Sequence, residues 1–236
     1  MREDLIQGVI QRFMMFLNED KPQADLSPAR AVGMNASLPQ SIHVPFAGSG
    51  AFGFEYVLAS QNLSAHLWRS SYSFDSWLVT PKDTVQHLSR KCADSLMSDQ
   101  SIQVNFWEKD AEQIAALRDN VDSFTKHAPS GFSCTIHHKD VMDPQLWATF
   151  EGCQSTFFIN PPYGDRLENQ QGVGTLYLQL WGYLEQLVES SGVLICPDRK
   201  TYEAGRLRLQ SRFQVKGFRF LHGGTPRWAL YWKPAL

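Results

Sequence analysis

The feature of the sequence that most restricts its fold is a regular alternation of short apolar runs with longer amphipathic segments. Runs rich in β-branched and aromatic residues predict strands, and apolar residues at helical spacing predict helices. Strands are expected near 42–44 and at 102–108, 132–138, 156–159, 193–196, 213–220 and 228–232. Helices are expected at 4–17, 51–60, 82–97, 110–127 and 174–190. This alternation favours parallel βαβ units and therefore an α/β fold with a doubly wound sheet.

The last two predicted strands are separated by only a short segment that contains Gly223 and Gly224. A short glycine-rich turn joins antiparallel strands, so these two are expected to add an antiparallel hairpin at one edge of a mostly parallel sheet. Sheets of this kind bind ligands beyond the carboxyl ends of their strands. The residues that follow each predicted strand are therefore the candidates for a functional site.

Composition excludes several other classes of protein. With 236 residues, of which 43% are apolar and 12% aromatic, the chain has enough material for a packed core, which excludes a disordered or collagen-like chain. No apolar run approaches the roughly 20 residues of a membrane span, and the N-terminus lacks a signal-peptide pattern. The four cysteines show no zinc-binding spacing and are interpreted as reduced thiols, which predicts a cytoplasmic protein that does not bind a membrane.

Charge is distributed unevenly along the chain. The segment from Asp198 to Leu236 carries a net charge of +7, whereas the rest of the chain carries −9. Its nine basic residues are Arg199, Lys200, Arg206, Arg208, Arg212, Lys216, Arg219, Arg227 and Lys233. Two interpretations remain open: a solvated basic face, or a surface that contacts phosphate groups, with about half of the nine facing one ligand.

The first two strands end in residues suited to a nucleotide-like ligand. Gly48-Ser49-Gly50 follows the first strand, and glycines let the backbone approach a ligand at the start of the next helix. Glu108 ends the second strand, where a carboxylate can accept hydrogen bonds from a ribose diol. A tight structural turn and an ordinary surface glutamate are the alternative interpretations.

The third strand ends in His137-His138-Lys139-Asp140. Asp140 could accept a hydrogen bond from an adenine amino group. The two histidines suggest a metal site, but consecutive residues on a strand point to opposite faces of the sheet. We therefore expect no metal.

The fourth strand leads into Asn160-Pro161-Pro162-Tyr163, the most informative motif of the chain. The prolines restrict the backbone, so the Asn160 side chain and the Pro161 carbonyl are held outward as two acceptors. Two acceptors can take both hydrogens of an exocyclic base amine, which favours a nucleophilic nitrogen without a general base. Tyr163 offers a flat face on which a flipped base can stack. A plain Asn-Pro-Pro turn is the alternative.

Together these motifs resemble a known family. Pro45-Phe46-Ala47-Gly48-Ser49-Gly50, Glu108, Asp140 and the 160–167 segment Asn-Pro-Pro-Tyr-Gly-Asp-Arg-Leu occur in the order found in class I S-adenosylmethionine-dependent methyltransferases that modify amino groups. The extension Gly-Asp-Arg-Leu is most similar to the guanine-N2 methyltransferases of large-subunit ribosomal RNA, as are the aromatic segment around Phe74 and Trp77 and the terminal 221–232 stretch. The resemblance covers about residues 30–233 and implies a Rossmann-like fold.

The resemblance also implies roles for individual residues. The glycine loop would hold the methionine part of S-adenosyl-L-methionine, Glu108 the ribose, and Asp140 with the Val141 N–H the adenine. The implied cofactor-binding residues are Pro45, Ala47, Gly48, Ser49, Gly50, Glu108, Lys109, Asp140, Val141 and Asn160. The implied catalytic residues are Asn160, Pro161, Pro162 and Tyr163.

The resemblance implies a nucleic-acid substrate, RNA rather than DNA, with guanine N2 as the target amine. The alternatives are a DNA adenine-N6 methyltransferase and a non-catalytic binding module, the latter because Val44 stands where the family usually has an acidic residue. Residues 1–35 are expected to form a helix and a connector, and residues 36–236 the methyltransferase domain. Because the family's usual RNA-binding module does not fit in 1–35, RNA capture would fall to the basic segment or to a partner protein.

Overall fold

The structure of the chain is a computed structural model, and it describes residues 3–19, 38–61, 81–94, 101–128, 131–163 and 170–235. All statements below concern these residues. The predicted domain boundary at 35/36, the aromatic segment around Phe74 and Trp77, and the Gly164–Leu167 extension lie outside them. No helix in the described ranges is both long and apolar enough to cross a membrane.

One seven-stranded sheet forms the centre of the molecule, with the strand order β3-β2-β1-β4-β5-β7-β6. The strands are β1 (Ser41–Pro45), β2 (Ile102–Glu108), β3 (Phe132–His138), β4 (Thr156–Ile159), β5 (Ser191–Cys196), β6 (Phe213–His222) and β7 (Thr225–Pro234). Strands β1 to β5 pair in parallel, whereas β7 is antiparallel to both β5 and β6. The predicted mostly parallel sheet with an antiparallel C-terminal hairpin is confirmed.

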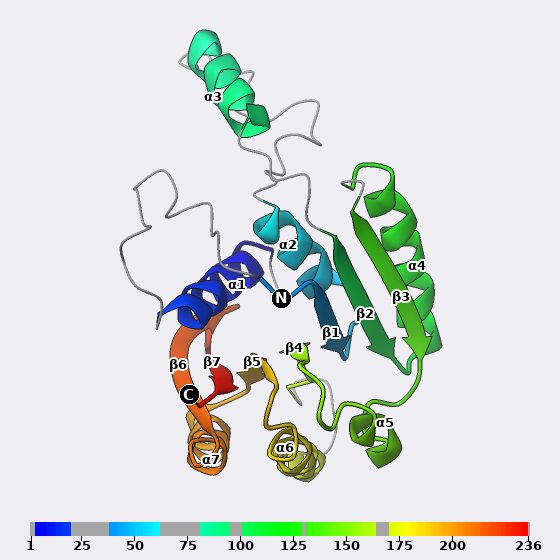
Figure 1. Cartoon of the computed structure of the whole chain (residues 1–236), viewed down its shortest axis with the longest axis vertical. Coiled ribbons are helices and arrows are strands. Elements are labelled where there is room, and N and C mark those ends of the chain that lie inside the picture. The colour runs from blue at the N-terminus through cyan, green and yellow to red at the C-terminus, as the bar shows by residue number, and fades with distance from the viewer. Residues whose placement is uncertain are drawn as a thin grey trace.

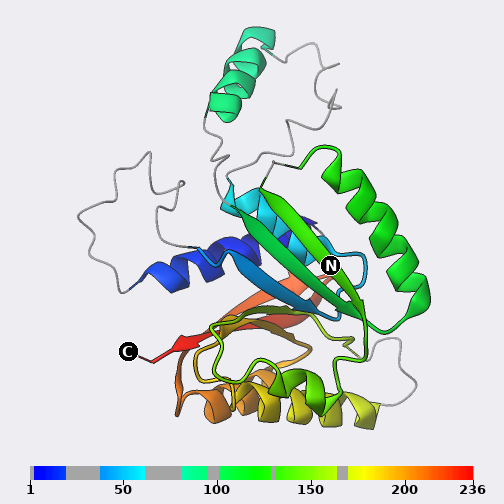
Figure 2. The same ribbon diagram turned by 45° about the vertical axis from the view of Figure 1, so that its right-hand side comes forward.

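Helices cover both faces of this sheet (Figures 1 and 2). One layer holds α1 (Glu3–Asn18), α2 (Ala51–Ser60) and α4 (Ala111–Thr125), and the other holds α5 (Pro144–Ala148), α6 (Gln170–Leu184) and α7 (Arg199–Leu209). A further helix, α3 (Lys82–Asp94), lies between β1 and β2 in the sequence. Two helical layers around a mostly parallel sheet are the expected result of successive crossover connections.

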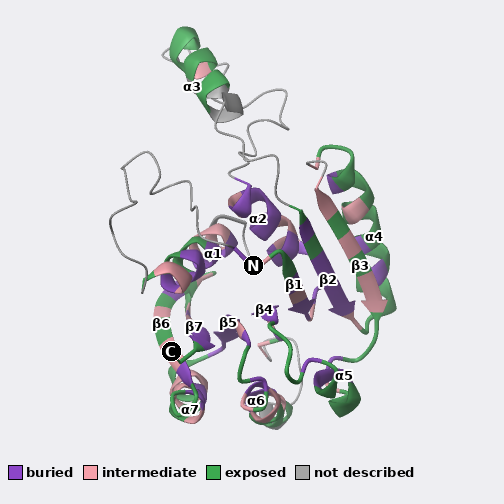
Figure 3. Cartoon of the chain, viewed as in Figure 1, coloured by how far each residue is buried: buried purple, intermediate pink, exposed green. Residues whose placement is uncertain are grey.

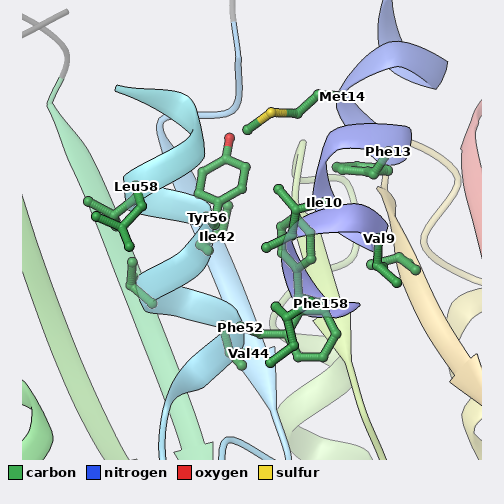
Figure 4. Packing of buried hydrophobic residues seen from close by; sticks show 14 of the residues in the cluster. Val9, Ile10, Phe13, Met14, Ile42, Val44, Phe52, Tyr56, Leu58 and Phe158 are labelled. Atoms are coloured by element: carbon green, nitrogen blue, oxygen red, sulfur yellow. The ribbon is translucent and has the colours of Figure 1, made fainter. Parts of the chain in front are cut away.

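Two apolar cores, one on each face, hold the layers together. Between the sheet and the α1 layer, the ring of Phe13 packs edge-on against Phe158 of β4 at 5.3 Å, and Tyr56 of α2 lies 5.1 Å from Phe158 (Figure 4). Most residues of β1, β2 and β4 are buried, whereas those of the edge strand β3 are intermediate or exposed (Figure 3). Val44 is buried in the first core at 2% exposure, so its side chain serves packing.

The structure differs from the sequence prediction in three helices. Neither α5 nor α7 was expected, although each has an aspartate N-cap: Asp143 accepts from the Gln145 N–H and Asp198 from the Thr201 N–H. In addition, α6 ends at Leu184 rather than near residue 190. Tight turns follow it, such as that from the Ser190 N–H to the Leu187 carbonyl at 2.8 Å, and they return the chain into β5.

Gly192 provides a test of the packing of β5. A Cβ atom there would lie 2.3 Å from the Phe157 carbonyl oxygen and 2.7 Å from the Trp232 ring, so Gly192→Ala is expected to lower the free energy of unfolding by about 1–3 kcal/mol or more. The matched control is Gly182→Ala, which meets nothing within 4 Å and lies in α6. It should be neutral or stabilising, because alanine favours a helix. Urea unfolding curves compare the two variants, and equal midpoints would contradict this packing.

Candidate active site

The carboxyl ends of β1 and its neighbours β2 and β4 meet at one edge of the sheet, because these strands are parallel and adjacent. The residues predicted to be functional follow these ends directly. The sheet therefore brings together the glycine loop after β1, Glu108 at the end of β2 and Asn160 after β4. Asp140 lies just beyond the end of β3, which is the next strand outward.

The loop after β1 has a backbone that only a few residue types adopt readily. Phe46, Gly48 and Gly50 have φ angles of 56°, 52° and 86°, in the left-handed region that favours glycine. The Gly50 N–H donates to the Ala47 carbonyl at 2.8 Å, and the Ser49 carbonyl accepts from the Asn120 side chain of α4 at 3.0 Å. Because Gly50 caps α2 without a side-chain acceptor, the N-terminus of α2 is suited to a negative or polar ligand group.

Glu108 joins this loop to the end of β2. Its carboxylate accepts from the Gly48 N–H at 3.0 Å, from the Lys109 N–H at 2.9 Å and from the Asp110 N–H at 3.0 Å. A carboxylate has about four lone-pair sites, so these three donors fix its position and leave capacity for a further donor. This arrangement suits a group that holds a ligand hydroxyl in one orientation.

Lys109 and Asp140 form the outer rim of the same edge. Lys109 Nζ lies 3.4 Å from an Asp140 carboxylate oxygen, and the other oxygen accepts from the Met142 N–H at 2.9 Å. Both side chains are about half exposed or more, at 63% and 48%, so the ion pair contributes little to stability. Val141 is buried, and its carbonyl accepts from the indole Nε1 of Trp147 at 2.6 Å, which holds this backbone in place.

The two histidines at the end of β3 point to opposite faces, as expected for consecutive strand residues. His137 stacks on Trp107 with ring centroids 3.8 Å apart, whereas His138 Nε2 lies 3.0 Å from the Lys109 carbonyl. Burial lowers the pKa of His137, and burial together with nearby His137 lowers the pKa of His43 to about 4. His43 is therefore neutral at pH 7. Within the described ranges, no three His, Cys, Asp or Glu side chains are grouped to hold a metal ion.

The motif after β4 has a preformed internal contact. The Tyr163 hydroxyl donates to Asn160 Oδ1 at 2.5 Å. Pro161 is buried and Pro162 is exposed, so the segment leaves the core at this point. A carbonyl oxygen has two lone pairs, and Asn160 Oδ1 can therefore accept from both the tyrosine and a further donor.

Arg227 is a site residue whose position the sequence analysis missed. Its guanidinium carbon lies 4.5 Å from the centre of the Tyr163 ring, and its Nη1 donates to the Pro197 carbonyl at 2.8 Å. The His222 ring meets Tyr163 edge-on at 6.1 Å. Arg227 is only 5% exposed, so its contact with the aromatic face is desolvated and fixes the ring. An arginine directly before the apolar run 228–232 of β7 was the available signal.

The sheet order, the glycine loop after β1, the carboxylate at the end of β2 and the Asn-Pro-Pro-Tyr segment after β4 define a Rossmann-like fold of the class I methyltransferase type. The sequence profile of the UPF0020 family, the RMKL-like methyltransferase domain, matches residues 23–227. The chain belongs to this family of methyltransferases.

Individual relatives and structures agree with this assignment. A Synechocystis protein provisionally named as an RNA methyltransferase is 26% identical over 200 residues, covering 82% of this chain and 47% of that protein. Ribosomal RNA large subunit methyltransferase K/L of Acinetobacter baylyi is 28% identical over 155 residues, covering 63% of this chain and 20% of that protein. The chain thus spans about half or less of the length of these relatives.

Among solved structures, a protein provisionally described as a methyltransferase and crystallised with SAH is similar in fold. It superposes with a TM-score of 0.64 and 18% sequence identity, and the match covers 89% of this chain and 52% of that one. This likeness confirms the predicted Rossmann-like architecture.

Proposed function

We propose that this chain transfers a methyl group from S-adenosyl-L-methionine to an exocyclic base amine of nucleic acid, with guanine N2 of ribosomal RNA as the target. The observation that carries the proposal is the position of the Asn160–Tyr163 pair. It follows β4, the strand that pairs with β1, so it lies beside the glycine loop at one edge of the sheet. A polar acceptor and an aromatic ring next to a nucleotide-type loop suit the methylation of a base.

The residues at this edge fit the cofactor. The left-handed glycines carry no side chain and so let a ligand approach the loop backbone closely, and the Glu108 carboxylate retains capacity for a ribose hydroxyl. Asp140 stands at the end of β3, where one oxygen is already fixed by the Met142 N–H. When bound, S-adenosyl-L-methionine supplies the methyl group, which the target amine displaces from the sulfonium sulfur.

Asn160 acts on the amine by accepting a hydrogen bond from it. A base amine is a weak nucleophile because its lone pair is delocalised into the ring. Drawing its hydrogens toward Asn160 Oδ1 and the Pro161 carbonyl favours a localised lone pair, and the fixed acceptors need no reorganisation during the reaction. Tyr163 provides the stacking face, and Arg227 holds its ring in place from one side.

The choice of RNA rests on the relatives, whose names specify RNA and large-subunit ribosomal RNA. The choice of guanine rests on the resemblance of the Gly-Asp-Arg-Leu extension to guanine-N2 methyltransferases. Adenine N6 in DNA is the second candidate, because the same two acceptors suit that amine. The non-catalytic module was suggested by Val44, which replaces an acidic residue of the family. Val44 is buried in the core and leaves the other proposed cofactor-binding residues in place, so we favour this alternative less.

Label transfer tests the proposal. The protein is incubated with S-adenosyl-L-methionine carrying a labelled methyl group, and with unmodified ribosomal RNA or DNA in separate reactions. We expect label in RNA. Label in DNA alone would favour the adenine-N6 alternative, and binding of cofactor without transfer to either polymer would favour the non-catalytic module.

Tyr163 variants separate stacking from hydrogen bonding. Tyr163→Ala is expected to weaken RNA capture by about 1–3 kcal/mol, the scale of base–aromatic stacking, and so to raise the KM for RNA. Tyr163→Phe keeps the ring and removes only the hydrogen bond to Asn160, so its KM should stay near that of the wild type. Steady-state kinetics with RNA as the varied substrate measure the difference. Equal KM values for the two variants would show that the ring does not stack on the base.

A further inference from the structure

We propose that Arg199, Lys200 and Arg219, here called the rim cations, bind the phosphates of the RNA strand whose base enters the Asn160–Tyr163 site. This inference rests on the proposed function and adds the surface that holds the polymer. It also divides the nine cations of the basic segment: Arg227 is buried against Tyr163, and the structure gives the other eight two different environments.

Five of the nine cations lie away from the active-site edge and already have partners within the chain. Those partners are Glu203 for Arg206, Glu185 for Arg208, the Glu185 carbonyl for Arg212, Glu19 for Lys216 and the Phe16 carbonyl for Lys233. Binding phosphate through these residues would first require breaking an internal contact. They therefore fit a structural role.

The rim cations are far less engaged. Among the described residues, the side chains of Lys200 and Arg219 make neither an ion pair nor a hydrogen bond, and both residues are exposed. Arg199 has one carboxylate at 3.9 Å, that of Glu203, and its side chain is 77% exposed. Glu203 also pairs with Arg206 at 2.8 Å, and the Asp198 carboxylate accepts from the Thr201 N–H as the cap of α7. The nearby carboxylates are thus occupied mainly by other groups.

The packing of α7 on β6 brings Arg199 and Arg219 to the same level. Tyr202 lies directly over Gly217, where an added Cβ would be 2.1 Å from the tyrosine hydroxyl oxygen. Arg219 lies two residues beyond Gly217 on the same face of β6. Arg199 lies one turn before Tyr202 on α7, which runs in the opposite direction. Both steps lead toward the active-site edge, so the two arginines lie near each other there.

Strand register connects this patch to the active site. Arg219 pairs with Trp228 of β7, which in turn pairs with Cys196, the last residue of β5. Beyond Arg219, the same hairpin contributes His222 and Arg227, and both contact the Tyr163 ring. A strand whose base stacks on Tyr163 would therefore meet the rim cations as its backbone continues across the β6–β7 hairpin.

The test compares two double variants that remove the same charge from the same elements. Arg199→Gln with Arg219→Gln removes the two rim cations that the packing of α7 on β6 brings together, one from each element. The matched control, Arg206→Gln with Lys216→Gln, also removes one cation from each element, but both of these are ion-paired. Fluorescence anisotropy measures the Kd of each protein for a labelled single-stranded RNA between 50 and 300 mM salt, without cofactor.

The rim variant is expected to reduce the magnitude of the log–log salt slope by about 1.4, since each phosphate contact to a single strand contributes roughly 0.7. Its Kd at low salt should rise about tenfold or more. The control should stay within about twofold of the wild type. An unchanged slope for the rim variant, or an equal loss in the control, would overturn the proposal, since only net charge would then matter.

Measurements of cofactor binding and label transfer distinguish a failure of the rim proposal from a failure of the proposed function. A wild-type protein that methylates RNA while the rim variant binds RNA normally overturns the rim proposal alone. A wild-type protein that binds RNA through the rim cations but transfers no methyl group overturns the proposed function. In both variants, calorimetry with S-adenosyl-L-methionine should give the wild-type affinity.

Discussion

Asn160→Ala is expected to lower kcat by about 10²–10³-fold, the loss seen when a preorganised polar group at a reacting centre is removed. The variant retains Tyr163, Arg227 and the glycine loop, so the affinities for cofactor and RNA should change little. The effect should therefore fall on kcat and not on KM. Single-turnover methylation with saturating cofactor and RNA measures it directly.

The control for Asn160→Ala is the thermal unfolding midpoint, which should match that of the wild type because Asn160 is only half buried. Removing the side chain also leaves the Tyr163 hydroxyl without its partner Oδ1 atom. Tyr163→Phe removes the same hydrogen bond but keeps Asn160, so its kcat measures how much the hydrogen bond between Tyr163 and Asn160 contributes to turnover. Near-full turnover in Asn160→Ala would refute the polarised-amine mechanism.

Glu108→Ala is expected to weaken the binding of S-adenosyl-L-methionine by roughly 1.5–3 kcal/mol, the scale of a hydrogen bond to a charged group. That corresponds to a Kd increase of about ten- to over a hundredfold. The carboxylate also accepts the N–H groups of Gly48 and Lys109, so its loss should loosen the loop as well. Isothermal calorimetry measures the change.

Glu112→Ala is the matched control for Glu108→Ala. Glu112 lies four residues after Glu108, in the first turn of α4, and its carboxylate is exposed. The substitution keeps the helix cap, because Asp110 accepts from the backbone N–H of residue 112 and not from its side chain. The control should bind cofactor within about twofold of the wild type, since a distant exposed charge contributes little. A Kd in Glu108→Ala equal to that of the control would remove Glu108 from the cofactor site.

Much of the sheet could be predicted because its strands carry their own local signal. The central strands β4 and β5 are short apolar runs that are buried on both faces, as the continuous pattern of Phe157 and Phe158 indicates. The glycine loop, Glu108 and Asn160 were placed correctly at strand ends because parallel strands expose all their carboxyl ends at one edge.

Helix α7 could not be predicted from apolar periodicity, because only Gly205 and Leu209 of its eleven residues are buried. Gly205 is needed there, since the Trp181 ring lies 2.4 Å from where its Cβ would be. Helix α5 has five residues, which is too short for a periodic signal. In both helices an N-cap aspartate carries the local information.

Pairings between distant segments were equally inaccessible from the sequence. The basic segment showed an excess of positive charge, but its neutralisation depends on Glu19 and Glu185, which lie in other parts of the chain. Arg206 and Arg208 contribute to that excess, and their ion pairs at 2.8 and 2.6 Å could not be inferred from composition. The contact of Arg227 with Tyr163 likewise spans 64 positions and arises only from the sheet order.

The identity of the methylated nucleoside tests the account most directly. RNA and DNA are incubated with the protein and labelled S-adenosyl-L-methionine, digested to nucleosides and separated by chromatography with mass detection. The account predicts labelled N2-methylguanosine from RNA, formed by the wild type and nearly absent with Asn160→Ala. Label on a ring nitrogen, carbon or ribose oxygen, or equal label with Asn160→Ala, would contradict methylation of an exocyclic amine at this site.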